Sequence, residues 1–274
     1  MRPVILYRPT GSPRSDDEER LAAMEAGFRV IARRTEAEAG DVVVGRYSVV
    51  PYYRELAADL LSKGAHLVNS TLEHDFASDM RNWYGELKDV TPETWFRLQD
   101  VEGDGPFVLK GSENSRKNQW DTHMFAATRR DLSVVHSRLS QDGLIGQQDI
   151  CVRRYVPLVT YGNAIGGVPI TREWRYFVCR GEVLVGGYYW DAFADDVAIP
   201  PRDREESLEA LTLVETVARQ LRPKSSFFTI DVAEKEDGGW MVVELNDGQM
   251  AGLCGVRPGS LYRGLWSALG GMGC

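Results

Sequence analysis

The sequence has few cysteines and histidines, and none of them is spaced to bind zinc or to form a disulfide framework. Its four cysteines, Cys151, Cys179, Cys254 and Cys274, include no C-x-x-C pair, and its four histidines are equally scattered. Zinc sites and disulfide-rich domains need closely spaced ligands or paired cysteines, so both classes are excluded. Scattered cysteines are typical of reduced thiols in a cytoplasmic protein, which is the compartment we predict.

Long apolar runs are also missing. No stretch approaches the roughly 18 apolar residues that a membrane span requires, and the N-terminal run MRPVILYRPT is too short for a signal peptide. We therefore expect no membrane association. The formal net charge of −8 makes nucleic acid an improbable partner, although a few local cations are enough to hold a small anionic ligand.

The first part of the chain alternates between strand and helix patterns. Short apolar runs at 4–7, 41–45 and 66–69 predict strands, with intervening helices that begin at Ser15 and span 53–63. Ser15 followed by Glu18 forms a capping-box pattern at the start of the first helix. This alternation predicts a small, mostly parallel α/β domain over residues 1–91.

After residue 91 short strands, glycine-rich links and hairpins predominate, and we expect a second domain over residues 92–274. The segment 111–121 is polar, and we expect a mobile loop there. A later helix is expected to be capped by Asp203. The elements expected in this domain are strands at 107–110, 149–156, 172–179, 182–190, 227–233 and 240–245, with a helix at 128–139.

A predicted hairpin near the C-terminus brings acidic side chains together. If 236–239 form a four-residue turn, Asp231 and Glu244 are directly opposite, at roughly 4.5 to 5.5 Å between Cβ atoms, and Asn246 shares their face. Two carboxylates and an amide oxygen suit Mg²⁺ or Mn²⁺. Alternatively, Asp231 ends its strand and Glu244 faces solvent. Apolar neighbours favour burial: Phe227, Phe228, Ile230, Val242, Val243 and Leu245.

Several cations are candidates for binding a nucleotide phosphate. Lys110 ends an apolar strand, and Arg116 and Lys117 lie in the polar loop that follows, which lacks the Walker spacing. That loop is either a lid over phosphates or a solvated surface loop. On the expected strand 172–179, alternation places Glu173 and Arg175 on one face, as an ion pair or as a bidentate contact to an anionic ligand.

Taken in chain order, these features resemble the ATP-grasp superfamily: a strand ending in lysine, a polar loop, a hinge strand, an E-x-R strand, an aspartate and a closing E-x-N. The resemblance covers about residues 92–255, and VELNDG at 243–248, preceded by FTIDV at 228–232, is its most specific part. More narrowly, the chain is similar to the compact R2K clade, which is associated with peptide-tagging or peptide-modifying systems in bacteria and phages. The resemblance implies two α+β lobes that grip ATP, a smaller lobe at about 92–156 and a C-terminal lobe at about 157–274, preceded by a small α/β domain.

The resemblance also implies roles for individual residues. Lys110 matches the lysine at the nucleotide phosphate and adenine. Arg175 matches the arginine at the γ-phosphate or acyl-phosphate, with Arg172 assisting. The matched metal ligands are Asp231, Glu244 and Asn246, and the matched adenine hinge comprises Gln148, Asp149, Ile150, Cys151 and Val152.

Two departures from the family pattern stand out. The loop after Lys110 is not rich in small residues and glycine, and Gln147 and Gln148 stand where an acidic residue is common, which leaves the ribose contact unassigned between Asp149 and its neighbours.

The implied activity is an ATP- and Mg-dependent ligase that activates a carboxylate as an acyl-phosphate and joins it to an amine, on an amino acid or a peptide. Its partners would be ATP and small-molecule or peptide substrates. The same nucleotide site could serve a phosphotransferase, or a nucleotide-binding module without catalysis. Aromatic runs at 83–84, 95–96 and 188–190 could line a substrate pocket, although such residues at this spacing more often belong to a core.

Overall fold

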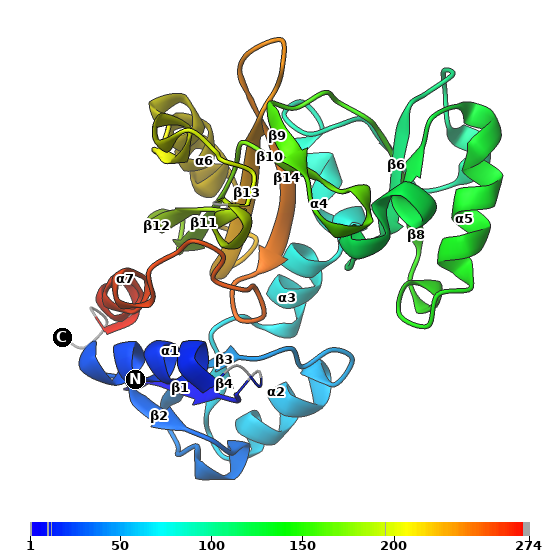
Figure 1. The fold of residues 1–274 in the computed structure, drawn as a ribbon. Coiled ribbons are helices and arrows are strands. Elements are labelled where there is room, and N and C mark those ends of the chain that lie inside the picture. Colours follow the sequence, from blue (N-terminus) through cyan, green and yellow to red (C-terminus); the bar gives the residue numbers. More distant parts are fainter. Residues whose placement is uncertain (1, 10, 12, 195, 271–274) are drawn as a thin grey trace.

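The computed structural model describes residues 2–9, 11, 13–194 and 196–270 (Figure 1). These residues form three four-stranded sheets, a two-stranded ribbon and the helices that cover them. Cys274 lies outside the described residues. None of the helices in the described part of the chain combines the length and apolar character that crossing a bilayer requires.

The N-terminal sheet is parallel, with strand order β2-β1-β3-β4. It confirms the three predicted strands and adds β2, whose three residues are too few to show a period. The first helix begins at Pro13, so the predicted cap at Ser15 is wrong. The elements are β1 (Arg2–Tyr7), α1 (Pro13–Glu25), β2 (Arg29–Ile31), β3 (Asp41–Arg46), α2 (Tyr53–Ser62) and β4 (His66–Leu67).

Two helices that the sequence did not reveal follow this sheet, α3 (Thr71–Ser78) and α4 (Met80–Leu87). Ser70 caps α3 in a reciprocal capping box with Glu73. Apolar side chains of both helices belong to the same core as the large C-terminal sheet, including the fully buried Trp83. The boundary at residues 91 and 92 therefore stays a prediction, since these helices precede it and pack beyond it.

The smaller lobe is an antiparallel sheet of order β5-β8-β6-β7, covered by α5 (Figure 1). Part of the segment expected to be a loop forms helical turns, a 3-10 turn at Lys117–Gln119 and a π-helical turn at Trp120–Met124. The buried Met124 anchors this segment. The elements are β5 (Thr94–Trp95), β6 (Phe107–Gly111), β7 (Phe125–Ala126), α5 (Leu132–Ser140) and β8 (Ile150–Arg154).

The C-terminal lobe is built on an antiparallel sheet of order β12-β11-β13-β14. Asp203 lies in a separate 3-10 turn and Ser207 is the N-cap residue of α6, so the predicted cap at Asp203 is wrong. The elements are the ribbon β9 (Thr160–Asn163) and β10 (Pro169–Thr171), then β11 (Glu173–Cys179), β12 (Glu182–Tyr188), α6 (Leu208–Leu221), β13 (Phe227–Glu234), β14 (Trp240–Asp247) and α7 (Pro258–Gly270).

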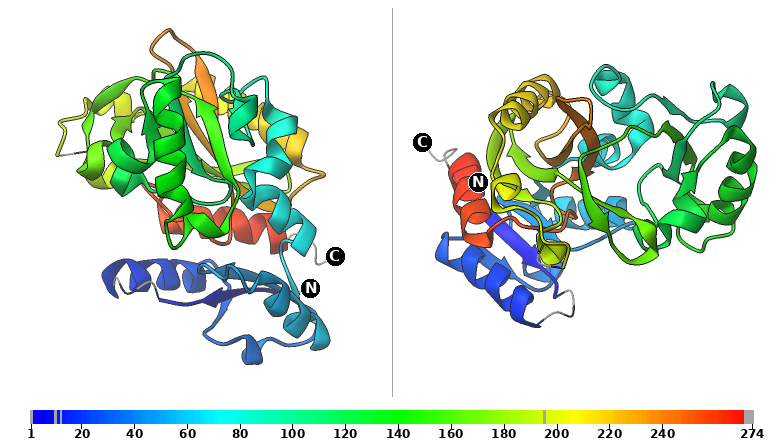
Figure 2. Two further views of the ribbon diagram at one scale, coloured as in Figure 1. Left: turned by 90° about the vertical axis from the view of Figure 1, so that its right-hand side faces the viewer. Right: turned by 45° about the horizontal axis from the view of Figure 1, so that its top comes forward.

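Strand alternation gives this sheet two different faces. Tyr176 and Ile230 point into the core that α6 shares, while Phe177 and Phe227 point to the opposite face and pack with α7 and the N-terminal sheet. Helix α7 lies between the N-terminal sheet and the rest of the molecule (Figure 2). The apolar end of the face that carries Phe177 and Phe227 thus packs against the N-terminal domain. The other end of the same face carries polar side chains.

Candidate active site

The final hairpin sets Asp231 opposite Glu244, which confirms the predicted pairing, but the turn differs from the prediction. Lys235 N donates to Gly239 O at 3.0 Å, so the loop contains three residues and not four. This alone would shift the register by one residue. A β-bulge at Val243 compensates, because Val232 pairs with Val242 and Asp231 with Glu244. Thr229 and Asn246 are the next opposed pair on the same face.

Both carboxylates of this face are paired with cations from neighbouring strands. Asp231 is fully buried, and its two oxygens accept hydrogen bonds from Arg175 Nε at 2.8 Å and Nη2 at 2.7 Å. Glu244 accepts from Lys110 Nζ, which crosses from β6. Burial opposes the charge on Arg175, but the Asp231 carboxylate outweighs it and raises the pKa of Arg175. Positive and negative side chains therefore alternate on this face of the sheet.

Lys110 lies among several cations. Burial and the positive charges of Arg153 and Lys117 lower the pKa of Lys110 to about 7, while Cys151 and the Asp231 carboxylate act in the opposite direction. An anion that enters here meets three positive groups whose mutual repulsion it would relieve.

Asp231, Glu244 and Asn246 are a hard, all-oxygen donor set on one face. The Asn246 amide has no hydrogen bond to another described residue, and the neighbouring Thr229 Oγ1 is buried without a partner. Among the described residues no three His, Cys, Asp or Glu side chains converge as a metal site. Two carboxylates and an amide fit Mg²⁺, which usually takes one or two carboxylates and completes its shell with phosphate oxygens and water.

A cavity lies beside this face, between the smaller lobe and the edge strand β14. Its walls are largely apolar, and Lys110, Lys117, Arg153 and Glu244 line its polar side. Apolar walls suit a flat aromatic base, and the cations suit its phosphates. The apolar and aromatic lining residues are Pro92, Val108, Trp120, Met124, Tyr155, Val156, Leu158, Pro169, Met241 and Val243.

Arg153, like Lys117, lines this cavity without an ion pair to a carboxylate in the described part of the chain. It is buried and donates to Val243 O at 2.7 Å, to Thr91 Oγ1 at 2.7 Å and to Thr94 Oγ1 at 3.3 Å. Burial lowers the pKa of Arg153 to about 10. A buried charge with only neutral acceptors is costly, and an anionic ligand would offset that cost.

Lys117 closes the other side of the cavity. Its Nζ donates to Tyr189 Oη at 2.7 Å, and the Tyr189 ring also faces the Arg175 guanidinium at 4.9 Å. Glu173 is buried nearby: Oε2 accepts from Thr171 Oγ1 at 2.9 Å, while Oε1 has no partner and burial raises the pKa of Glu173. Lys117, Glu173 and Arg175 thus lie together near Asp231, whereas strand alternation predicted a common face for Glu173 and Arg175 only.

Other predicted nucleotide contacts lie away from this cavity. Arg116 is bound by Asp142 at 2.7 and 2.6 Å, within the smaller lobe. Arg172 points to the opposite face from Arg175 and donates to Glu234 Oε2 at 2.6 Å. Each arginine forms its ion pair elsewhere, and neither lines the cavity.

The predicted hinge segment also lies outside the cavity, which is lined by the residues that follow it, Arg153 to Val156. Cys151 and Val152 are buried in β8, and Ile150 to Val152 pair with β6. Gln148 Oε1 accepts from the backbone N–H groups of Glu113 and Asn114, both at 3.2 Å, and Asp149 pairs with Arg81.

Arg153, Tyr155 and Tyr189 were not among the predicted site residues. The signal for Tyr155 was present, since the predicted lobe boundary at residue 156 places it in the link between the lobes. Tyr189 belongs to an aromatic run whose other members, Tyr188 and Trp190, are buried. Strand alternation would place Tyr188 and Tyr189 on opposite faces of the sheet. Because β12 ends at Tyr188, this pattern does not predict where the Tyr189 side chain lies.

The fold and this charged cleft define an ATP-grasp protein. Residues 98–269 match the model of the ATP-grasp domain, R2K clade family 3, and because this is more than half of the chain, the chain belongs to that family. The predicted α+β ATP-grasp fold, ATP as the nucleotide and the class of ATP-dependent ligase are thereby confirmed. No curated protein sequence matches the chain.

Solved structures show the same fold at low sequence identity. D-cycloserine synthetase DcsG has a TM-score of 0.64 at 14% identity, covering 98% of this chain and 99% of that one. The ATP-grasp ligase PsnB, complexed with a minimal precursor, has a TM-score of 0.58 at 14% identity, with 98% and 99% covered. D-alanine–D-alanine ligase from Bacillus anthracis, complexed with ATP, has a TM-score of 0.58 at 13% identity, with 97% and 94% covered.

Proposed function

We propose that this protein joins a carboxylate to an amine through an acyl-phosphate made from ATP. The observation that carries the proposal is the alternating set of charges on the cleft face: Lys110 with Glu244, and Arg175 with Asp231, beside a cavity that holds the otherwise unneutralised Arg153. Such a set can accept the triphosphate of ATP and balance the charge that develops as its last phosphoryl group moves.

In the proposed first half-reaction, a substrate carboxylate oxygen attacks the γ-phosphorus of ATP, the bond to the β-phosphate oxygen breaks, and ADP leaves. Lys110, Lys117 and Arg153 neutralise the phosphates, and Arg175, oriented by Asp231, faces the transferred group. Asp231, Glu244 and Asn246 would hold Mg²⁺, which supplies charge neutralisation at the phosphate oxygens. In the second half-reaction the amine nitrogen attacks the acyl carbon, inorganic phosphate leaves and the nitrogen loses a proton.

The substrates we propose are an amino acid or a peptide for at least one of the two groups. Three proteins of the same fold support this choice by their descriptions: a D-cycloserine synthetase, a ligase complexed with a precursor, and a D-alanine–D-alanine ligase. Another PsnB structure, with a TM-score of 0.55, is described with Mg and ADP, which supports the proposed metal and nucleotide.

Hydroxylamine trapping tests the proposal. The protein is incubated with ATP, Mg²⁺, hydroxylamine and pools of amino acids and N-acetylated amino acids as carboxylates. We expect ADP, phosphate and a hydroxamate, all lost when Mg²⁺ is chelated. A stable phosphorylated alcohol would indicate a phosphotransferase, and bound ATP without any product would indicate a nucleotide-binding module; either result contradicts the proposal.

A further inference from the structure

The segment between β6 and β7 forms one wall of the nucleotide cavity. Ser115, Lys117, Trp120 and Met124 line the cavity from this segment, and we call residues 115–124 the lid segment. The other walls of the cavity include residues of the ribbon strand β10 and of the edge strand β14. The lid segment therefore lies between the two lobes, and its position decides how far the cavity is closed.

The lid segment rests on a pair of glycines of the C-terminal lobe, Gly166 and Gly167, in the turn between β9 and β10. Both glycines have a positive φ, +78° and +82°. A Cβ atom at Gly166 would collide with the backbone carbonyl of Asn118, and one at Gly167 would collide with the carboxylate of Asp121. Glycine alone meets both conditions, the positive φ and the close approach, at low cost. The turn is therefore shaped to receive the lid segment.

Lys117 crosses from the lid segment to the C-terminal lobe. Besides the 2.7 Å hydrogen bond to Tyr189 Oη, its Nζ lies 4.1 Å from the centre of the Tyr189 ring and 5.4 Å from that of the Trp190 ring. Aromatic rings attract a cation placed near their faces, so two rings and one hydroxyl hold the amine. The Tyr189 ring also faces Arg175 at 4.9 Å. Tyr189 thus connects a cation of the nucleotide cavity to the arginine that faces the transferred phosphoryl group in the proposed reaction.

Glu173 is the competing partner for Lys117. Its Oε2 accepts from Thr171 Oγ1 at 2.9 Å and from Trp190 Nε1 at 3.1 Å, whereas its buried Oε1 has no hydrogen bond within the described part of the chain. Burial raises the pKa of Glu173, and the charge of Lys117 acts in the opposite direction. A lysine paired with this carboxylate would be neutralised and turned away from the phosphates. The hydroxyl of Tyr189 holds the amine in the cavity instead.

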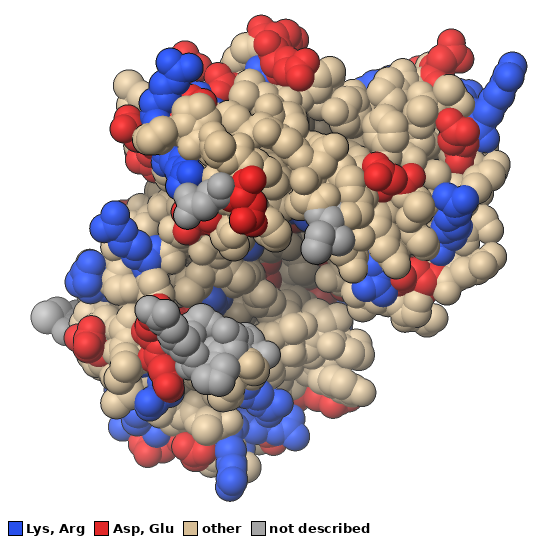
Figure 3. Space-filling view, in the orientation of Figure 1, with Lys and Arg blue, Asp and Glu red and all other residues tan. Residues whose placement is uncertain are grey.

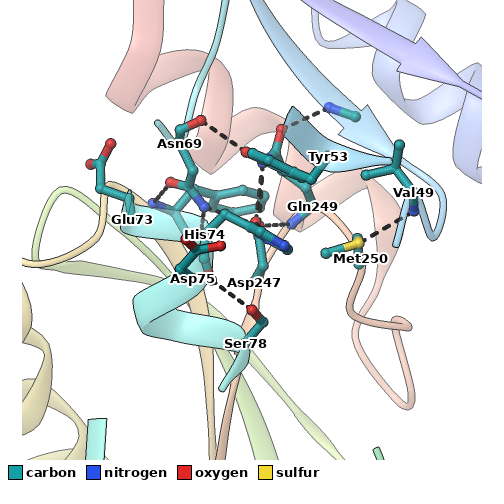
Figure 4. Close-up of polar contacts among 12 residues, drawn as sticks. Val49, Tyr53, Asn69, Glu73, His74, Asp75, Ser78, Asp247, Gln249 and Met250 are labelled. Atoms are coloured by element: carbon teal, nitrogen blue, oxygen red, sulfur yellow. Dashed lines mark hydrogen bonds and ion pairs between the residues drawn. The ribbon is translucent and has the colours of Figure 1, made fainter. Parts of the chain in front are cut away.

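Tyr189 belongs to the lobe that is joined to the N-terminal domain by buried hydrogen bonds. At the end of β14, Asp247 accepts from Asn69 Nδ2 at 3.0 Å and forms a 2.9 Å hydrogen bond with His74 Nδ1 (Figure 4). On the face drawn in Figure 3, a hollow separates the N-terminal domain from the lobes above it. We therefore take Tyr189 as the fixed partner and the lid segment as the part that closes on it.

We propose that Tyr189 is a positioning residue: its hydroxyl holds Lys117 at the phosphates of ATP when the lid segment is seated on Gly166. The inference rests on the function proposed above and adds a condition to it. Lys110 and Arg153 are placed in the cavity by strands β6 and β8, whereas Lys117 is placed by contacts between the lobes. The third cation is therefore added when the lid segment closes, a step that also keeps water from the phosphoryl group.

A double-mutant cycle on the rate of hydroxamate formation tests this role. Tyr189→Phe keeps the ring and removes the hydroxyl, and we expect kcat to fall about tenfold, the usual effect of losing a hydrogen bond to a charged group. The KM for ATP should stay within threefold, because Lys110 and Arg153 still bind the phosphates. In the Lys117→Met background the same change should alter kcat less than twofold, because the hydroxyl acts through Lys117. Tyr52→Phe, at an exposed tyrosine, is the control and leaves kcat within twofold. An unchanged kcat in Tyr189→Phe, or an equal loss in both backgrounds, overturns the proposal.

Cleavage by trypsin after Arg116 and Lys117 reports whether the lid segment is closed. With a non-hydrolysable ATP analogue and Mg²⁺, we expect the wild type to be cleaved there at least tenfold more slowly than without them. In Gly166→Ala this protection should fall below threefold, since the added methyl group collides with the lid segment. Gly40→Ala is the matched control: Gly40 has a φ of +84° and open space around an added Cβ, so the change introduces similar backbone strain without touching the lid segment.

Protection from trypsin needs no turnover, so it separates this inference from the proposed function. If the wild type forms no hydroxamate, the proposed function fails, and the inference is judged by protection alone. Tyr189→Phe must then reduce the protection at least threefold, and because it removes only a hydroxyl, it keeps the test valid if Gly166→Ala does not fold. The proposal is overturned by an unprotected wild type, by equal protection in Tyr189→Phe and Tyr52→Phe, or by equal protection in Gly166→Ala and Gly40→Ala.

Discussion

Two buried arginines of the cleft differ in how their charge is balanced. Arg175 is held by both oxygens of the fully buried Asp231, whereas Arg153 donates to two threonine hydroxyls and one backbone carbonyl. A paired charge stabilises its surroundings only as long as both partners are present. A charge with neutral acceptors is costly until an anion arrives. The first arginine therefore has a structural role as well as its proposed catalytic one, and the second depends on the ligand.

Removing one partner of the Arg175–Asp231 pair leaves the other charge buried. We expect Asp231→Asn and Arg175→Met each to lower the free energy of unfolding by about 3 to 5 kcal/mol. The double variant should lose clearly less than the sum, because no unpaired charge remains. Urea unfolding of the wild type, the two single variants and the double variant measures this coupling. Additive losses would show that the pair does not act as a unit.

Replacing Arg153 removes a cation from the nucleotide cavity. We expect Arg153→Met to weaken binding of a non-hydrolysable ATP analogue at least tenfold, which corresponds to about 1.4 kcal/mol, and to reduce the rise in Tm that the analogue produces. Isothermal calorimetry and thermal denaturation measure the two effects. Arg97→Met, which changes an arginine of the same lobe that is 69% exposed, is the matched control. Equal affinities of the two variants would contradict the role of Arg153.

Among the structural elements, the β13–β14 hairpin shows why some features could be predicted and others could not. The opposition of Asp231 and Glu244 follows from strand alternation and from apolar flanks, which are local properties of the sequence. The three-residue turn and the bulge at Val243 depend on which backbone groups find partners across the sheet. The prediction made the turn one residue too long and omitted the bulge. These two errors cancelled, so the predicted pairing of Asp231 with Glu244 was correct.

The bulge itself has a function that can be tested. Its residue Val243 lines the nucleotide cavity, and its carbonyl accepts from Arg153 at 2.7 Å. Deleting Val243 should leave Asp231 opposite Glu244 but remove this anchor, so we expect a folded protein with at least tenfold weaker ATP binding. Deleting Asp237 shortens the distant turn without changing the paired residues, and it serves as the control. Circular dichroism checks the fold, and calorimetry measures the affinity.

Side chains that need distant partners were the least predictable part of the site. Arg116 and Arg172 had the residue type expected for phosphate binding, but Asp142 and Glu234, which neutralise them, are far from them in sequence. Helices α3 and α4 were missed because each has only eight residues. His74 therefore carried no recognisable signal, since its partner Asp247 lies at the other end of the chain.

In the molecule as a whole, the N-terminal domain is hydrogen-bonded to the segment that follows the β13–β14 hairpin. Arg46 is buried and donates to Glu19 Oε1 at 2.8 Å, to Gly248 O at 2.6 Å and to Ala251 O at 3.0 Å. These bonds, together with α7, fix the parallel sheet against the C-terminal lobe. The pattern of strands and helices predicted both domains, but not the residues that join them.

Loss of the Arg46 hydrogen bonds should lower the stability of the whole protein. Arg46→Met leaves Glu19 buried without its cation, and we expect the free energy of unfolding to fall by about 3 to 5 kcal/mol. In differential scanning calorimetry the single transition of the wild type should move to lower temperature and broaden or split. Arg33→Met, at an exposed arginine of the same domain, should change neither. An unchanged transition in Arg46→Met would show that the domains are held together by other contacts.

The fate of a labelled carboxylate oxygen decides whether the protein makes an acyl-phosphate. The carboxylate substrate identified by hydroxylamine trapping is prepared with ¹⁸O in its carboxyl group and incubated with ATP, Mg²⁺ and an amine, and the phosphate released is examined by ³¹P NMR. We predict ADP together with phosphate that carries one ¹⁸O atom, because the carboxylate oxygen bonds to the γ-phosphorus and leaves with it. Unlabelled phosphate, or AMP and pyrophosphate in place of ADP, would contradict the proposed ligase chemistry.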